Sequence, residues 1–226
     1  LSILGAGGTV STPFEGVTAE VVEVKSLEEV DVLGGREGVE GKIVFYNKAF
    51  NQRYINIGTS YGETGFQRRL GAIKAAEYGA VASIFRSLSS SNDDYPHTGS
   101  MSYKEGVDSI AHGGLGVLSS VKLSEKIKAD PKTKLTVRLS GKWFPDALSH
   151  NVIGEIKGSE NPDNIILVGG HLDSWDVSEG AHDDGAGCVH SIGALRLFQK
   201  QGIKPKNTLR AVMFMNEENG LRGGTQ

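Results

Sequence analysis

Two apolar stretches separated by a helical pattern place the strongest constraint on the fold. Residues 164–170 read NIILVGG and residues 208–216 read TLRAVMFMN, and both are near-continuous apolar runs. Strands of this kind are typical of parallel sheets, which are covered on both faces. The segment between them, residues 186–201, has the pattern of a crossover helix, and such crossovers are right-handed. The chain is therefore predicted to contain a βαβ unit whose two strands run in the same direction.

Ionisable side chains follow both predicted strands. His171 and Asp173 come directly after the first strand, and Glu217 and Glu218 come directly after the second. Because open α/β sheets bind ligands at the carboxyl ends of their strands, these side chains are expected to share one edge of the sheet. The glycine-bounded loop that leaves the first strand can bring Asp183 to the same place. Four or five ionisable groups are thus predicted to converge from three separate segments.

Carboxylates that converge in this way repel one another and are costly to desolvate. A divalent metal removes both penalties, and imidazole with carboxylate oxygen is a donor set that suits zinc. If residues 171–173 stay extended, the side chains of His171 and Asp173 point to the same face, so Asp173 is expected to orient the imidazole. The adjacent Glu217 and Glu218 point in different directions. One of them can bind metal while the other acts as a general base on a metal-bound water.

The front part of the chain carries a second set of α/β elements. Strands are predicted at residues 17–25, 42–47, 80–85 and 134–139, and helices after Ser26, at 65–78 and at 121–129. Between them, residues 87–114 are rich in Ser, Gly and Asp and are predicted to form a long loop. The composition changes at residues 140–151. A domain boundary is therefore expected near Gly141, which divides the chain into residues 1–141 and 142–226.

Composition excludes some classes of function. The net charge of −3 gives no broad attraction to nucleic acid or to an anionic membrane. No apolar run reaches the roughly 18 residues that a membrane span needs. The single cysteine, Cys188, cannot form an intrachain disulfide and is expected to be a small buried thiol. The chain begins without an initiator Met and ends soon after the acidic pair, so we expect it to be an excerpt of a longer protein.

Three short motifs carry a resemblance to a known family. HLD, HDDGAG and NEEN stand where the M28 family of co-catalytic zinc exopeptidases has its H-x-D, D-D-G and E-E motifs. The likeness extends through GHLDSWDV, PHTG, KIVFYN and PKNTLR, and it covers nearly the whole chain. The front part resembles the protease-associated (PA) insert of that family. The implied fold is α/β, with a PA-like β/α insert domain followed by the first part of a zinc-exopeptidase doubly wound mixed sheet.

The resemblance also implies a role for each matched residue. His171 is similar to a ligand of one zinc, Asp183 to the carboxylate that bridges two zincs, and Glu218 to a ligand of the other zinc. Glu217 is similar to the general base, and Asp173 to the residue that orients His171. A complete catalytic domain of this kind binds two Zn²⁺ ions. Two further ligands, an Asp and a His, are expected beyond the last residue, so the excerpt alone is expected to be inactive.

Neighbours of these residues receive less specific expectations. His182 is expected to be an ordinary loop residue, and Asp176 and Glu179 are expected to be solvated acids. Asp184 is expected to shape the turn, and the peptide bond before it is commonly cis in the family. Cys188 is expected to place its thiol on the buried face of the helix.

The implied activity is the metal-dependent hydrolysis of small peptides by an exopeptidase or dipeptidase. The expected partners are small peptide substrates, and relatives are often dimers, so a homodimer is a candidate. The resemblance suggests a secreted, periplasmic or lysosomal setting. Two alternatives stay open. One is a catalytically inactive binding or receptor module that keeps the peptidase fold, and the other is a one-zinc enzyme of the glutaminyl-cyclase type, which the PA-like insert disfavours.

Overall fold

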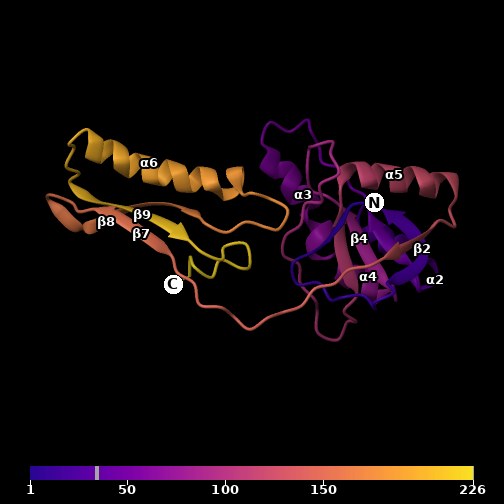
Figure 1. The fold of residues 1–226 in the computed structure, drawn as a ribbon. Coiled ribbons are helices and arrows are strands. Elements are labelled where there is room, and N and C mark those ends of the chain that lie inside the picture. Colours follow the sequence, from indigo (N-terminus) through magenta and orange to yellow (C-terminus); the bar gives the residue numbers. More distant parts are fainter. Residues whose placement is uncertain (34–35, 226) are drawn as a thin grey trace. The chain divides into compact units, whose positions relative to one another are not determined.

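The computed structural model describes residues 1–33 and 36–225. The chain divides into two compact units, Leu1–Phe144 and Pro145–Gln226. Among the described residues, none of the helices combines the length and the apolar character that a membrane crossing requires. Each unit is an α/β structure with its own sheet (Figure 1).

The first unit is built on a six-stranded sheet with the order β1-β5-β4-β3-β2-β6. The four inner strands are parallel, and the two edge strands, β1 and β6, are antiparallel to their neighbours. The strands are β1 (Ile3–Gly5), β2 (Val17–Val24), β3 (Ile43–Tyr46), β4 (Ala82–Arg86), β5 (Ala111–Leu115) and β6 (Lys134–Val137). The helices are α1 (Leu27–Val32), α2 (Arg36–Val39), α3 (Ile57–Arg69), α4 (Gly71–Glu77) and α5 (Val117–Ala129).

The core of this unit lies on both faces of the sheet. All four residues of β3 are buried, as the apolar run KIVFYN predicts for a central parallel strand. Successive side chains point to opposite faces, so Val44 and Tyr46 pack in one cluster with α4, while Ile43 and Phe45 pack in another with Leu123 of α5. Parallel pairing of β3 with β2 and β4 places the carboxyl ends of these strands side by side.

The helix predicted at residues 65–78 is wrong as a single element. The structure has two helices, α3 and α4, and Leu70 lies between them. The ring of Tyr46 packs closely on Gly71, where an added Cβ would lie 2.8 Å from a ring carbon. The Tyr46 hydroxyl also donates a hydrogen bond of 2.8 Å to the Gly71 carbonyl oxygen. This tertiary contact, which periodicity along the chain cannot show, accompanies the break.

The long loop predicted at residues 87–114 is also wrong in part, because β5 begins inside it. This strand reads AHGGL, and all five residues are buried. Because three of its five residues are glycine or histidine, β5 lacks the apolar pattern that identifies the other strands. Close packing explains the glycines, since a Cβ at Gly113 would lie 3.0 Å from the Leu4 carbonyl oxygen of β1 and one at Gly114 would lie 2.8 Å from that of His97.

The second unit contains a three-stranded mixed sheet with the order β7-β9-β8. Its strands are β7 (Val152–Ile156), β8 (Asn161–His171) and β9 (Asn207–Phe214). A turn, η1 (Ala181–Gly185), and the helix α6 (Ala186–Lys200) connect β8 to β9. Strands β8 and β9 are parallel, which confirms the predicted βαβ arrangement, and β7 is antiparallel to β9.

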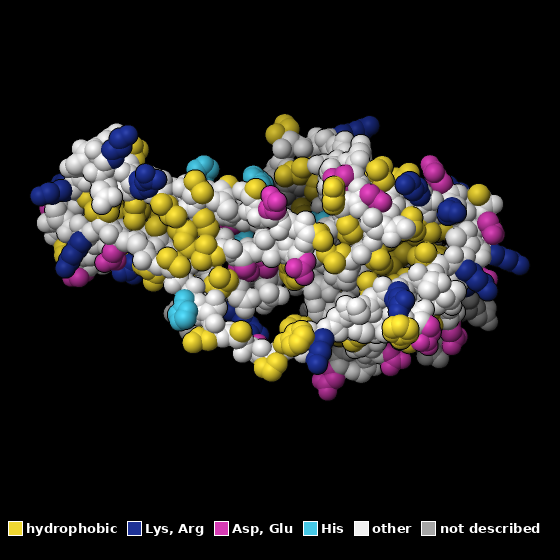
Figure 2. All heavy atoms as spheres, in the orientation of Figure 1, with side chains coloured by type: hydrophobic (Ala, Val, Ile, Leu, Met, Phe, Trp, Pro, Cys, Tyr) yellow, Lys and Arg dark blue, Asp and Glu magenta, His cyan; other side chains and the backbone are white. Residues whose placement is uncertain are grey.

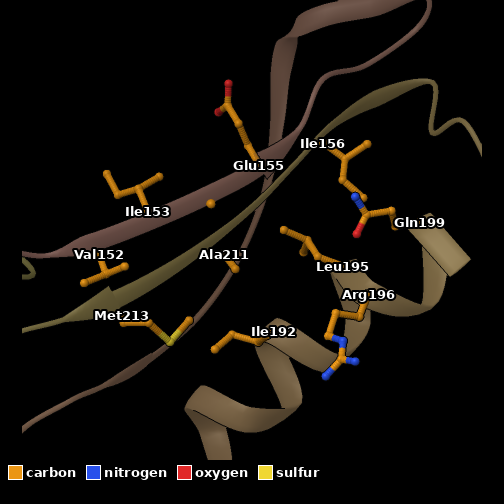
Figure 3. Close-up of a pocket in the computed structure, with 11 residues that line it drawn as sticks. Val152, Ile153, Glu155, Ile156, Ile192, Leu195, Arg196, Gln199, Ala211 and Met213 are labelled. Carbon is orange, nitrogen blue, oxygen red and sulfur yellow. The ribbon is translucent and has the colours of Figure 1, made fainter.

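Helix α6 lies along the sheet of the second unit (Figure 1). Cys188 of α6 packs against Ala211 and Met213 of β9, and its side chain is buried as expected. An apolar hollow of about 260 Å³ opens between α6, β7 and β9, and Ile192, Leu195 and Met213 are among the residues that line it (Figure 3). Figure 2 shows further hydrophobic side chains on the surface of this unit beside α6. The carboxyl end of β8 and the segments that follow β8 and β9 carry the polar groups described next.

Candidate metal centre

Three segments of the second unit bring ionisable side chains together at the carboxyl edge of its sheet. His171 is the last residue of β8, Asp183 lies in η1, and Glu218 follows β9. One potential ligand atom from each of these three side chains lies within 4.8 Å of the others. The His171 Nε2 atom is 2.9 Å from Asp183 Oδ1 and 3.8 Å from an oxygen of Glu217. The residues that the motifs single out are therefore neighbours in space.

His171 is fixed by contacts on both its ring and its backbone. Its Nδ1 atom lies 2.8 Å from the carbonyl oxygen of Asp173, which can only accept, so Nδ1 carries a proton and donates. The backbone N–H of His171 donates to Asp184 Oδ2 at 3.1 Å, and the thiol of Cys188 donates to the His171 carbonyl oxygen at 3.2 Å. These contacts aim Nε2, the nitrogen that would bind a metal, toward the carboxylates.

Asp173 connects the ends of the two strands. Its Oδ1 atom accepts a hydrogen bond of 3.0 Å from the N–H of Glu217, and its Oδ2 atom accepts one of 3.1 Å from the N–H of Glu218. Its carboxylate lies 3.7 Å from the Nδ1 atom of His171, so the carbonyl oxygen makes the shorter contact with the ring. The side chain of Asp173 was expected to orient the imidazole, but the contacts divide this task differently. The carboxylate of Asp173 holds the acidic pair, and its backbone carbonyl holds the imidazole.

Asp184 shapes the turn in the way that its position suggests. Its Oδ1 atom accepts from the N–H of Gly187 at 3.0 Å, while Oδ2 accepts from the N–H of His171. The Asp183–Asp184 peptide bond is cis. A Cβ at Gly187 would lie 2.3 Å from Asp184 Oδ1, and a Cβ at Gly170 would lie 2.6 Å from the Cys188 nitrogen. The glycines of GGHLD and HDDGAG are therefore needed for close packing around this turn, and His182 is exposed beside it.

The electrostatics of the site favour a cation. Burial and the charge of Asp183 raise the pKa of Glu218, although a hydrogen bond from the Trp175 side chain lowers it in part. Burial lowers the pKa of His171, but hydrogen bonds to Asp173 and Asp183 and the charge of Glu217 outweigh it, so the net shift is upward. Negative charges on Asp183 and Glu217 contribute to both upward shifts. One imidazole nitrogen and two carboxylates form a donor set that fits a divalent metal such as zinc.

Sequence reasoning missed the contact between Trp175 and Glu218. Trp175 lies in the loop after β8, and its side chain hydrogen-bonds the carboxylate that follows β9. The only signal in the sequence is its place two residues after Asp173. A single aromatic residue at that distance predicts either packing or contact with a ligand, so the sequence could not select the hydrogen bond.

Comparison with known proteins agrees with the geometry. The model of peptidase family M28 matches residues 151–226. The resemblance to this family is thus confirmed, and residues 151–226 match its model. Over all 226 residues the chain is 41% identical to carboxypeptidase Q of Homo sapiens, and it covers 46% of that protein. The chain therefore spans about half the length of the curated relatives that it matches.

Solved structures show the same fold. A peptidase M28 precursor from Shewanella amazonensis superimposes with a TM-score of 0.89 at 36% sequence identity, and the match covers 100% of this chain and 50% of the other. A zinc aminopeptidase from Bacillus subtilis superimposes with a TM-score of 0.61 at 23% identity, covering 99% of this chain and 47% of the other. The second likeness shows the fold alone. Both agree with a mixed α/β architecture of the M28 type.

Proposed function

We propose that the protein to which this chain belongs is a zinc-dependent exopeptidase that hydrolyses small peptides. The observation that carries the proposal is the convergence of His171, Asp183 and Glu218, from three segments, at one edge of the sheet. The similarity to M28 peptidases and to carboxypeptidase Q supports the same reaction class. Residues 142–226 would supply the first part of the catalytic domain, and residues 1–141 would form a PA domain.

The residues present would hold two zinc ions together with ligands from elsewhere in a complete protein. His171 would bind one zinc, Glu218 the other, and Asp183 would bridge them. Bound zinc lowers the pKa of a coordinated water and polarises a carbonyl group. These residues would therefore serve to place the scissile peptide carbonyl beside an activated water.

The remaining residues would move and place protons. Glu217 would accept the proton of the attacking water on its carboxylate and pass it to the leaving amine. Its carboxylate oxygen lies 3.8 Å from His171 Nε2, next to the ligand cluster. Asp173 would hold Glu217 and Glu218 in place through their backbone N–H groups. The adjacent glutamates could then act differently, one as a base and one as a ligand.

The setting of the enzyme is also a proposal. We infer that it acts on small peptides outside the cytosol, in a secreted, periplasmic or lysosomal form, and that it is a homodimer. The similarity to carboxypeptidase Q over the whole chain supports this assignment. Size-exclusion chromatography with light scattering on the full-length protein tests the dimer, and a mass of one chain would contradict it.

Substitution of the proposed base tests the function most directly. In the full-length protein, Glu217→Gln should lower kcat for dipeptide hydrolysis by about 10²–10⁴-fold, because general-base catalysis contributes a factor of that size. Zinc content, measured by mass spectrometry, should stay at two ions per chain. The matched control is Glu179→Gln, which removes an exposed acid in the same connection and should leave both measurements unchanged.

The outcomes separate the candidate functions. Hydrolysis close to the wild-type rate in Glu217→Gln would reject Glu217 as the base. One zinc per chain without peptidase activity in the wild-type protein would favour an enzyme of the glutaminyl-cyclase type. A wild-type protein that binds no zinc would favour the inactive binding module.

A further inference from the structure

A polar hollow lies in the first unit, away from the residues of the metal centre in sequence. It has a volume of about 520 Å³, and Glu23 of β2, Asn47 after β3 and Arg86 at the end of β4 line it. Ser124 and Lys128 of α5 complete one wall. The strands β2, β3 and β4 are parallel neighbours, so the hollow lies at their carboxyl ends. This is the edge of an open α/β sheet at which small ligands bind.

The carboxylates at the hollow already accept hydrogen bonds from the chain. Glu23 Oε1 accepts from Asn47 Nδ2 at 2.6 Å and from Ser124 Oγ at 3.0 Å. Glu29 Oε2 accepts from the backbone N–H of Lys25 at 2.7 Å. Both buried polar residues of this network, Asn47 and Ser124, are thus directed to Glu23. These hydrogen bonds hold the two carboxylates in place and satisfy one oxygen of each.

The cations at the hollow lack equivalent partners. Among the residues that the structure describes, no carboxylate forms an ion pair with Lys25, Arg86 or Lys128. The Arg86 guanidinium donates a hydrogen bond of 3.4 Å from Nη1 to Asn47 Oδ1. Its Nε atom is buried and has no hydrogen-bond partner within the described chain. Burial lowers the pKa of Arg86, and the charge of Glu23 opposes this shift.

A half-buried guanidinium without an anion is costly, because a charge that loses water needs a compensating partner. The planar donors of arginine match carboxylate and phosphate groups, and two further cations stand at the same opening. Groups of the chain donate to both carboxylates here, whereas the Arg86 guanidinium has one long hydrogen bond to a neutral amide and a buried Nε without a partner in the described chain. A ligand that compensates the Arg86 charge must therefore carry negative charge.

We propose that this hollow binds a small oxyanion, a carboxylate or a phosphate group, with Arg86 as its main contact and Lys25 and Lys128 at its rim. The site uses none of the residues proposed for hydrolysis. It would give the first unit a ligand-binding function of its own. The ligand is defined by its oxyanion group, and a carboxylate compound and a phosphate compound are the two sources to be distinguished.

Titration of the full chain with inorganic phosphate and, separately, with succinate tests the proposal at constant ionic strength. Isothermal calorimetry should detect saturable binding of at least one of the two anions. Arg86→Gln should weaken that binding by about tenfold or more, because hydrogen bonds to charged groups are the strong ones. Arg86→Lys should recover only part of the affinity, since it restores the charge without the planar donors. The matched control, Arg138→Gln, removes an exposed arginine of the same unit and should bind like the wild type.

A measurement on the unmodified protein guards against loss of folding in the variants. In ¹H–¹⁵N NMR spectra, the Nε–H signal of Arg86 should shift saturably with the anion, whereas that of Arg138 should not. Binding of phosphate alone would identify a phosphate site, and binding of succinate alone would identify a carboxylate site. The proposal would be overturned if neither anion bound saturably, or if Arg86→Gln bound the anion as tightly as the wild type does.

Discussion

The two units place ionisable side chains at the same topological position and reach opposite electrostatic results. At the carboxyl ends of β8 and β9, the groups around His171 are carboxylates. At the carboxyl ends of β2, β3 and β4, the groups that form no ion pair within the described chain include three cations, and Arg86 is the most buried of them. Sheet topology therefore determines where a site can form, whereas the side chains determine the charge of the ligand it can take.

Two histidines of the same two sheets sharpen this comparison. His112, on β5, is fully buried, and its Nε2 atom donates toward the Gln67 and Arg68 carbonyl oxygens at 3.1 Å, while Nδ1 accepts from the Ser83 hydroxyl at 2.7 Å. Burial lowers the pKa of His112 to about 4, despite these hydrogen bonds. His171 instead faces carboxylates, and its pKa is raised. A histidine on a strand is therefore structural or functional according to the partners that the fold gives it.

Removal of the imidazole at the sheet edge should have the largest effect. His171→Ala in the full-length protein should lower zinc affinity by more than about 100-fold, which is the upper figure for loss of a residue that only supports a ligand. Competition with a chromophoric chelator measures this affinity. His182→Ala removes an exposed imidazole from the same loop and is the matched control. Equal affinities of His171→Ala and the wild type would break the comparison between the two histidines.

The buried histidine should instead appear in the pH dependence of stability. The unfolded chain binds the proton of His112 with a pKa near 6.5 and the folded chain with a pKa of about 4, so the unfolded state holds more protons between these values. The stability of the first unit should be full above about pH 6.5 and should fall by roughly 3 kcal/mol as the pH drops to about 4. Urea unfolding followed by NMR signals of β4 and β5 measures it.

A variant isolates the contribution of that histidine. His112→Asn should lose stability at neutral pH, because it removes a buried, hydrogen-bonded ring, and should show a weaker dependence on pH between 4 and 6.5. His150→Asn, which removes an exposed imidazole, should keep the wild-type dependence. A His112→Asn protein with the wild-type pH dependence would show that other groups are responsible.

The smallest of these effects should come from the residue that joins the two strand ends. Asp173→Asn should lower zinc affinity by about 10–100-fold, the usual cost of losing a residue that supports metal ligands. The amide keeps one acceptor oxygen for the N–H groups of Glu217 and Glu218 but replaces the other with a donor. Asp176→Asn, at an exposed position in the same loop, is the control. An affinity equal to that of the wild type would mean that Asp173 does not position the acidic pair.

The sequence by itself determined the elements with uniform local patterns. The apolar runs of β8 and β9, with a helix between them, predict parallel strands, and the parallel pairing is confirmed. The same runs predict that His171 and Glu217 lie at one edge of the sheet, where the structure places them 3.8 Å apart. These inferences succeed because burial on two faces and the hand of the crossover are general constraints that act on neighbouring residues.

Tertiary structure alone decided the features that depend on partners distant in sequence. The break between α3 and α4 accompanies the packing of Tyr46 on Gly71. Strand β5 contains glycines because neighbouring backbone atoms leave no room for a Cβ at Gly113 and Gly114. The carboxylate of Asp173 was expected beside the imidazole, yet it accepts hydrogen bonds from two N–H groups more than forty residues away. Local periodicity records which face of an element is buried, but a hydrogen bond depends on the atoms that folding brings within about 3 Å.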